Sequence, residues 1–127
     1  MGALYASLFT LKHPEVFRGA LCLSGRYRAA AFGRGDYNDD LYFNDPLAFV
    51  PNLGGHELAR VAQQVHLTLV VGRGRFEDGC IPETLEMGGA LRAKGIPHHL
   101  AVWGADSRHD YVWWQRQVRH YVPQLIR

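Results

Sequence analysis

The chain has 127 residues, 47% of them hydrophobic, which is the size and apolar content of one small domain with its own core. Its 14 Lys and Arg against 12 Asp and Glu give a formal net charge of only +2, and the basic residues are scattered, so neither nucleic acid nor an anionic membrane is an expected partner. No apolar run approaches the length of a membrane span and the first residues lack a signal-peptide pattern, so we expect a cytoplasmic protein.

The predicted elements alternate between helices and buried strands. The helices are predicted from apolar residues at helical spacing and from stop residues such as Pro14 and Gly95. The strands are short apolar runs bounded by turn residues. The first two are apolar on consecutive residues, a pattern typical of strands covered on both faces. In chain order, we predict a helix at 2–13, a strand at 17–25, a helix at 57–64, a strand at 66–72, a helix at 82–95, a strand at 98–104 and a helix from 110 onward.

Two of these helices have a predicted inward face. In the helix at 82–95, the periodicity puts Leu85, Gly88 and Leu91 on one side. In the last helix, the predicted inward residues share a helical repeat and are Tyr111, Trp114, Val118, Val122 and Leu125.

The stretch from 26 to 55 shows no sustained period. Its mixture of aromatic residues, acids and prolines predicts short irregular helices that cover something, rather than framework elements. Tyr37, Tyr42 and Phe43 could line a pocket there, and a satellite core is an equally open interpretation.

Alternation of this kind predicts an α/β fold in which parallel strands place their functional residues in the loops at their carboxyl ends. The loop after the second strand contains Glu77 and Asp78, and the loop after the third contains His109. An acid and a histidine so placed could approach each other, and the acid would then fix the imidazole tautomer. An equally open alternative is that Asp78 binds its own loop and His109 caps the last helix.

A nucleophile for such a pair is harder to find. Ser24 ends a strand, but no glycine stands two positions before it and no amphipathic helix follows, as a nucleophile elbow requires. Ser7 falls inside the first helix, and Ser107 falls in a loop expected to be flexible. Cys80 lies close to acids that disfavour a thiolate.

The two cysteines, Cys22 and Cys80, have no framework spacing, which favours a reducing compartment over a disulfide scaffold. They indicate no metal site either. Neither a metal nor another cofactor is predicted.

Four stretches together resemble a known family. They are "MGALYASLFTLKHPEVFRGALCLSG", the acidic loop "GRGRFED", "LRAKGIPHHLAVWGADSRHDYVWW" and the ending "YVPQLIR". The chain resembles the carboxyl-terminal part of an α/β-hydrolase of the putative-esterase group that includes esterase D, enterochelin-esterase-like and antigen-85-like proteins. Its start is similar to the second half of a G-x-S-x-G motif, with Met1 just after the serine and Gly2 as the closing glycine.

The resemblance implies a partial α/β-hydrolase fold over residues 1–127, with three parallel strands, flanking helices and a cap segment at 26–55. It implies that His109 is the catalytic histidine of a carboxylic ester hydrolase, with Asp78 favoured as the acid and Glu77 as the alternative. The amino-terminal strands, the nucleophilic serine and the early oxyanion donor would be missing. We therefore expect a serine-esterase fragment that is inactive alone, its parent acting on a small-molecule ester.

The resemblance assigns supporting roles to other residues of the last loop and helix. Asp110 would orient the loop or cap the helix. Trp103, Trp113 and Trp114 are interpreted as packing residues rather than substrate contacts.

Two other functions fit parts of the sequence. A non-catalytic interaction module could bind a partner through the exposed sheet edge that a missing neighbour of the first strand would leave, and self-association through that edge is expected of the isolated 127-residue chain. A phosphate-binding loop at "GRGR", built on Gly72, Gly74 and the arginines Arg73 and Arg75, is less favoured because acids follow it and the next helix starts late.

Overall fold

The computed structural model describes residues 2–28 and 45–126. Three strands, β1 (Gly19–Leu23), β2 (His66–Val71) and β3 (His98–Val102), form a parallel sheet in the order β1-β2-β3. All three strands lie within the ranges predicted from the sequence, each shorter by one or more residues at its ends. The sheet is parallel because a helical crossover separates each strand from the next.

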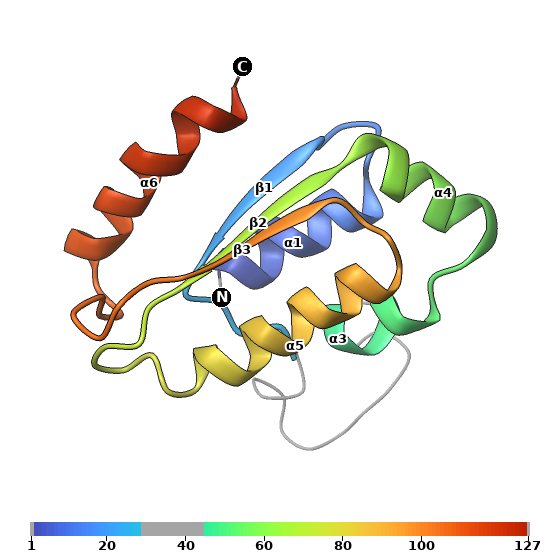
Figure 1. The fold of residues 1–127 in the computed structure, drawn as a ribbon. Coiled ribbons are helices and arrows are strands. Elements are labelled where there is room, and N and C mark those ends of the chain that lie inside the picture. Colours follow the sequence, from blue (N-terminus) through green and yellow to red (C-terminus); the bar gives the residue numbers. More distant parts are fainter. Residues whose placement is uncertain (1, 29–44, 127) are drawn as a thin grey trace.

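Helices cover both faces of the sheet. The described helical elements are α1 (Gly2–Lys12), α3 (Pro46–Phe49), the 3₁₀-helix η2 (Val50–Asn52), α4 (Gly55–Gln64), α5 (Cys80–Ala93) and α6 (Tyr111–Leu125). In Figure 1, α1 and α5 lie on one face of the sheet and α6 lies on the other. In the part of the chain that the structure describes, no helix is long and apolar enough to cross a membrane.

The central strand carries the core. Every residue of β2 after His66 is buried, as the prediction of a doubly covered strand requires. Leu67 and Leu69 are fully buried and belong to one cluster with Met87 and Leu91 of α5. The same covering was predicted for the first strand, but in β1 only Ala20 and Cys22 are buried, because β1, like the half-buried β3, lies at an edge of the described sheet.

The inward face of α5 agrees with the prediction at Gly88 and Leu91 but not at Leu85. Leu85 is 46% exposed, whereas the buried face includes Thr84, Met87, Gly88 and Leu91, at the i, i+3, i+4 and i+7 positions of one helical stripe. Gly88 lies on this face and packs against Leu100: a Cβ at Gly88 would stand 3.1 Å from the side chain of Leu100. Leu85 lies one residue along from the stripe, which turns it toward solvent.

The inward face of α6 was also predicted incorrectly. Tyr111 is 76% exposed, and the buried residues of α6 are the polar Gln117 and Tyr121. Gln117 Nε2 donates to Ser107 Oγ at 3.2 Å, and Trp103 Nε1 donates to Tyr121 Oη at 3.0 Å. These hydrogen bonds orient the helix toward the loop after β3.

Short helices occupy the described end of the irregular stretch, as expected: α3 and η2 lie between residues 46 and 52. Tyr37, Tyr42 and Phe43 lie outside the described residues. The cap segment therefore stays a prediction.

Candidate active site

Three loops leave the sheet along one edge. The backbone N–H of Ser24 donates to Val70 O at 2.8 Å, and that of Trp103 donates to Val71 O at 2.7 Å. These hydrogen bonds extend the parallel ladders one residue beyond β1 and β3. The loops after all three strands therefore begin side by side, at the edge where parallel sheets place functional groups.

The second and third loops are bound to each other through their backbones. Gly74 N donates to Ser107 O at 2.9 Å, and His109 N donates to Arg75 O at 3.0 Å. A Cβ on Gly72 or on Gly74 would overlap the backbone of Ser107, so these glycines permit the close approach of the two loops. The glycines of "GRGR" thus have a packing role, and Ser107 is fully buried rather than in a flexible loop.

This contact between loops brings Glu77 to His109. Nδ1 of His109 lies 3.2 Å from Oε2 of Glu77, whose side chain is fully buried, while the imidazole is 36% exposed. Phe76 has a positive φ of 67°, which turns the chain so that the next side chain points inward while Phe76 itself is 70% exposed. A buried carboxylate at one imidazole nitrogen fixes the tautomer with the other nitrogen free to accept a proton.

Asp78, which the resemblance favoured as the acid, points elsewhere. It is exposed, and among the described residues no hydrogen bond or ion pair joins it to His109. Of the two neighbouring carboxylates, the structure places Glu77 at the imidazole. Sequence spacing alone could not separate them, because adjacent loop residues point in different directions and only the turn at Phe76 decides which one faces inward.

Ser24 holds the other side of the same carboxylate. Its Oγ donates to Glu77 Oε1 at 2.5 Å, and Gly72 N donates to the same oxygen at 3.2 Å. Ser24 has a positive φ of 50°, a conformation that nucleophile elbows also use. Its hydroxyl nevertheless serves the acid, and among the described residues no hydrogen bond joins a hydroxyl to Nε2 of His109.

Trp114 belongs to the site, although the sequence assigned it to packing. Its ring stands edge-on to His109, with centroids 4.9 Å apart, and its Nε1 donates to Ser24 Oγ at 3.1 Å. Trp103 behaves as the packing residue expected, against His120 and Tyr121. The signal missed was position: Trp114 falls within the first turn of a helix that begins directly after the histidine loop.

The start of α6 is fixed by Asp110. Its side chain accepts a hydrogen bond from Trp113 N at 3.4 Å, which makes it the N-cap of the helix, one of the two roles expected for it. The cap sets the direction of α6 and so the position of Trp114 against the imidazole.

Cys80 also lies in the candidate active site. It begins α5, is buried, and its Sγ lies 3.9 Å from Nδ1 of His109. Burial raises the pKa of the Cys80 thiol to about 11, and the nearby Glu77 carboxylate adds to this shift. The thiol is therefore protonated at neutral pH and donates to Ser24 O at 3.2 Å. A protonated thiol is a poor nucleophile, which agrees with the low reactivity expected from the sequence.

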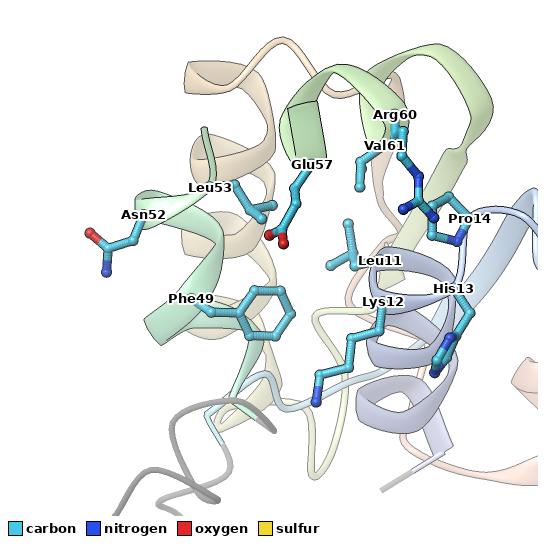
Figure 2. Close-up of a pocket in the computed structure, with 10 residues that line it drawn as sticks. All are labelled: Leu11, Lys12, His13, Pro14, Phe49, Asn52, Leu53, Glu57, Arg60 and Val61. Atoms are coloured by element: carbon cyan, nitrogen blue, oxygen red, sulfur yellow. The ribbon is translucent and has the colours of Figure 1, made fainter. Parts of the chain in front are cut away.

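A hollow of 440 Å³ lies at the other end of the sheet. Figure 2 shows the ring of Phe49 and the carboxylate of Glu57 pointing into it, opposite Leu11 at the end of α1. Because α1 ends before β1 begins and α4 ends before β2 begins, this pocket lies toward the amino ends of the strands. It contains none of the residues around His109 and is separate from the candidate active site.

Comparisons with known proteins identify the fold. No family model matches the sequence, and no curated protein matches it significantly. Among solved structures, the chain is similar to a ferulic acid esterase, with a TM-score of 0.75, 18% identity, and 97% of this chain and 46% of that chain covered. It is also similar to S-formylglutathione hydrolase (FrmB) from Staphylococcus aureus, with a TM-score of 0.75, 18% identity, and 100% of this chain and 52% of that chain covered.

The chain thus spans about half the length of these two structures. Its three parallel strands with flanking helices form part of an α/β-hydrolase fold, as the resemblance in the sequence implied.

Proposed function

We propose that this chain carries the histidine and the acid of a serine esterase, His109 and Glu77, and that the complete enzyme hydrolyses carboxylic esters. The observation that carries the proposal is the contact between His109 Nδ1 and the fully buried Glu77 Oε2, at 3.2 Å, on the carboxyl edge of a parallel sheet. A histidine oriented by a buried carboxylate is the part of a triad that activates a hydroxyl nucleophile.

In the proposed reaction, a serine hydroxyl attacks the ester carbonyl while Nε2 of His109 accepts its proton. His109 then gives that proton to the departing alcohol, and a water attacks the acyl-enzyme in the same way. Glu77 accepts the Nδ1–H bond throughout and stabilises the imidazolium that forms twice in each cycle. Ser24 and Gly72 donate to the second oxygen of Glu77, which keeps the carboxylate oriented.

The nucleophile is proposed to stand immediately before Met1, as the second half of the G-x-S-x-G pattern suggests. The 127-residue chain alone is then expected to show no esterase activity. Without a positioned serine and a preorganised oxyanion hole, the imidazole has no nucleophile to activate, and each oxyanion donor alone is worth roughly 3–4 kcal/mol.

The test compares this chain with a longer one read from the DNA upstream of the Met1 codon. An in-frame segment ending in Gly-x-Ser is expected, and the longer protein should hydrolyse p-nitrophenyl acetate and react with a fluorophosphonate. His109→Ala in the longer protein should lower turnover by about three orders of magnitude or more. His13→Ala is the matched control, since His13 lies at the far end of α1 and is 55% exposed.

Two results would contradict the proposal. One is an in-frame stop codon directly before Met1. The other is fluorophosphonate-sensitive turnover by the 127-residue chain alone, which would point back to Ser24 as the nucleophile.

A second candidate function is a non-catalytic module that associates through the edge of its sheet. Among the described strands, β1 has a neighbour on one side only. Beside it, a hollow of 500 Å³ opens between β1 and the end of α6. Edge strands of this kind recruit other strands. We therefore propose that such a module would self-associate through β1.

Sedimentation velocity tests the second candidate. An interaction module should form dimers that Leu21→Lys in β1 dissolves, while Val16→Lys, at a residue 65% exposed before the strand, leaves them intact. A monomer at all concentrations would remove the second candidate.

A further inference from the structure

One cluster of side chains offers three different metal-ligand atoms. Among the residues that the structure describes, Glu77, Cys80 and His109 each present one such atom, and the three atoms all lie within 4.8 Å of one another. Two of the three separations are close to those between ligand atoms around a bound ion. Nδ1 of His109 is 3.2 Å from Glu77 Oε2 and 3.9 Å from Cys80 Sγ.

These separations suit a tetrahedral zinc ion. With zinc–nitrogen, zinc–oxygen and zinc–sulfur bonds of ordinary length, tetrahedral ligands lie about 3.3 Å apart for N and O and about 3.6 Å apart for N and S. The N–O and N–S pairs differ from these values by a few tenths of an ångström. The third pair, a Glu77 carboxylate oxygen and Cys80 Sγ, lies within 4.8 Å, against about 3.5 Å in a tetrahedral site, so the Cys80 side chain would have to turn toward the carboxylate on binding. The backbone already holds the loops together.

We propose that Glu77, Cys80 and His109 form a binding site for Zn²⁺ or a similar divalent transition-metal ion, with a water as the fourth ligand. The donor set of thiolate, imidazole and carboxylate is the one that zinc takes in proteins. The partly exposed imidazole leaves an open side for the ion and its water to enter.

The supporting contacts are also those of a metal site. Ser24 Oγ and Gly72 N both donate to Oε1 of Glu77, which leaves Oε2 as the ligand atom and fixes its direction. Outer hydrogen bonds of this kind orient the carboxylate ligands of metal sites. Cys80 stands three residues after Glu77, at the first position of α5, and the backbone turn between them is closed by a hydrogen bond from Cys80 N to Glu77 O at 2.8 Å.

Binding has a defined proton balance. The Cys80 thiol would release its proton to solvent as the sulfur–metal bond forms, and its bond to Ser24 O would break. The proton on Nδ1 of His109 would leave for solvent, and Nε2 would hold a proton instead. No electron is transferred, and one proton is released overall for each ion bound.

This exchange has a consequence that rests on the proposed esterase function. A histidine with the metal on Nδ1 and a proton on Nε2 cannot accept the proton of a serine hydroxyl. Zinc would therefore inhibit ester hydrolysis reversibly, by occupying the nitrogen that the acid normally holds. Metal binding itself needs no activity, so the two ideas can fail separately.

The experiment is a titration of the 127-residue chain with Co²⁺, a spectroscopic substitute for Zn²⁺, followed by displacement with Zn²⁺. One equivalent of Co²⁺ should produce the intense near-ultraviolet absorption of a cobalt–thiolate bond, and Zn²⁺ should abolish it. Cys80→Ser should remove this absorption, and Glu77→Gln and His109→Gln should each weaken Zn²⁺ binding by at least about tenfold.

Matched controls keep the assignment specific. Cys22→Ala removes the other thiol and His98→Gln removes a histidine outside the cluster, and both variants should bind Co²⁺ as the wild type does. Circular dichroism checks that each variant folds. A measurement without variants is added: Zn²⁺ should protect Cys80 of the wild-type chain from alkylation, located by mass spectrometry.

The proposal is overturned by an absence of the thiolate absorption in the wild type, by its survival in Cys80→Ser, or by its loss in Cys22→Ala with the fold intact. Equal alkylation of Cys80 with and without Zn²⁺ would also overturn it. An inactive longer enzyme that binds zinc as expected would contradict only the proposed function.

Discussion

Ser24 and Glu77, 53 residues apart in the chain, are joined by a buried hydrogen bond of 2.5 Å from Ser24 Oγ to Glu77 Oε1. The bond links the end of β1 to the loop after β2, and Trp114 Nε1 continues it by donating to the same hydroxyl. The acid that faces His109 is therefore held by the loop after β1 and, through Ser24, by the first turn of α6.

The first prediction concerns this bond. Ser24→Ala should lower the free energy of unfolding by about 1–3 kcal/mol, because the buried carboxylate loses a donor and Trp114 loses an acceptor. Ser24→Gly should cost about 1 kcal/mol less than Ser24→Ala, since glycine adopts the positive φ without strain. Urea unfolding measures both, with Ser7→Ala as control.

Ser7 is a suitable control because it is as buried as Ser24 but bonds only within its own helix, to Leu4 O at 2.9 Å. Its loss should change stability by less than about 1 kcal/mol. Equal effects of Ser7→Ala and Ser24→Ala would show that the bond to Glu77 contributes nothing beyond burial.

The second prediction separates the two neighbouring acids. In the longer, active protein, Glu77→Gln should lower turnover by about 10⁴-fold, because the amide no longer fixes the imidazole tautomer. Asp78→Asn should leave turnover near normal, since Asp78 is exposed and away from His109. Steady-state kinetics with p-nitrophenyl acetate decide between them, and the reverse ranking would assign the role to Asp78.

The third prediction concerns the glycines between the loops. Gly74→Ala should destabilise the fold by at least about 1–3 kcal/mol, because its Cβ would overlap the backbone of Ser107 and Ala105. Gly89→Ala, on the exposed side of α5 with nothing within 4 Å, should instead stabilise it by about 0.5–1 kcal/mol. Thermal unfolding of the pair compares the same chemical change in two settings, and a stable Gly74→Ala would mean that the loops can separate freely.

The fourth prediction concerns alkaline pH. The pKa of the Cys80 thiol rises from 9.0 to about 11 on folding, so the folded chain keeps a proton that the unfolded chain loses. This contribution to stability is complete below pH 9 and disappears as the pH rises toward 11. Over that range the wild type should lose up to about 2 kcal/mol more unfolding free energy than Cys80→Ala does. Parallel losses in the two proteins would show that Cys80 does not contribute.

Much of the framework could be predicted from the sequence. The three strands, the alternation with helices and the edge that carries His109 all follow from local signals. Continuous apolar runs indicate buried strands, and proline, glycine and the Asp110 cap mark where helices begin or end. These signals can be read from the sequence because each depends only on residues a few positions away along the chain.

What the sequence left open was decided by contacts between distant residues. The positive φ of Phe76 selects Glu77 over Asp78, and no periodic pattern encodes a single turn. The buried side of α6 follows from bonds of Gln117 and Tyr121 to the loop after β3. Trp114 joins the candidate active site through a hydrogen bond to a residue 90 positions earlier. Local chemistry thus fixed which elements form, whereas only packing between the loops could determine which side chains meet.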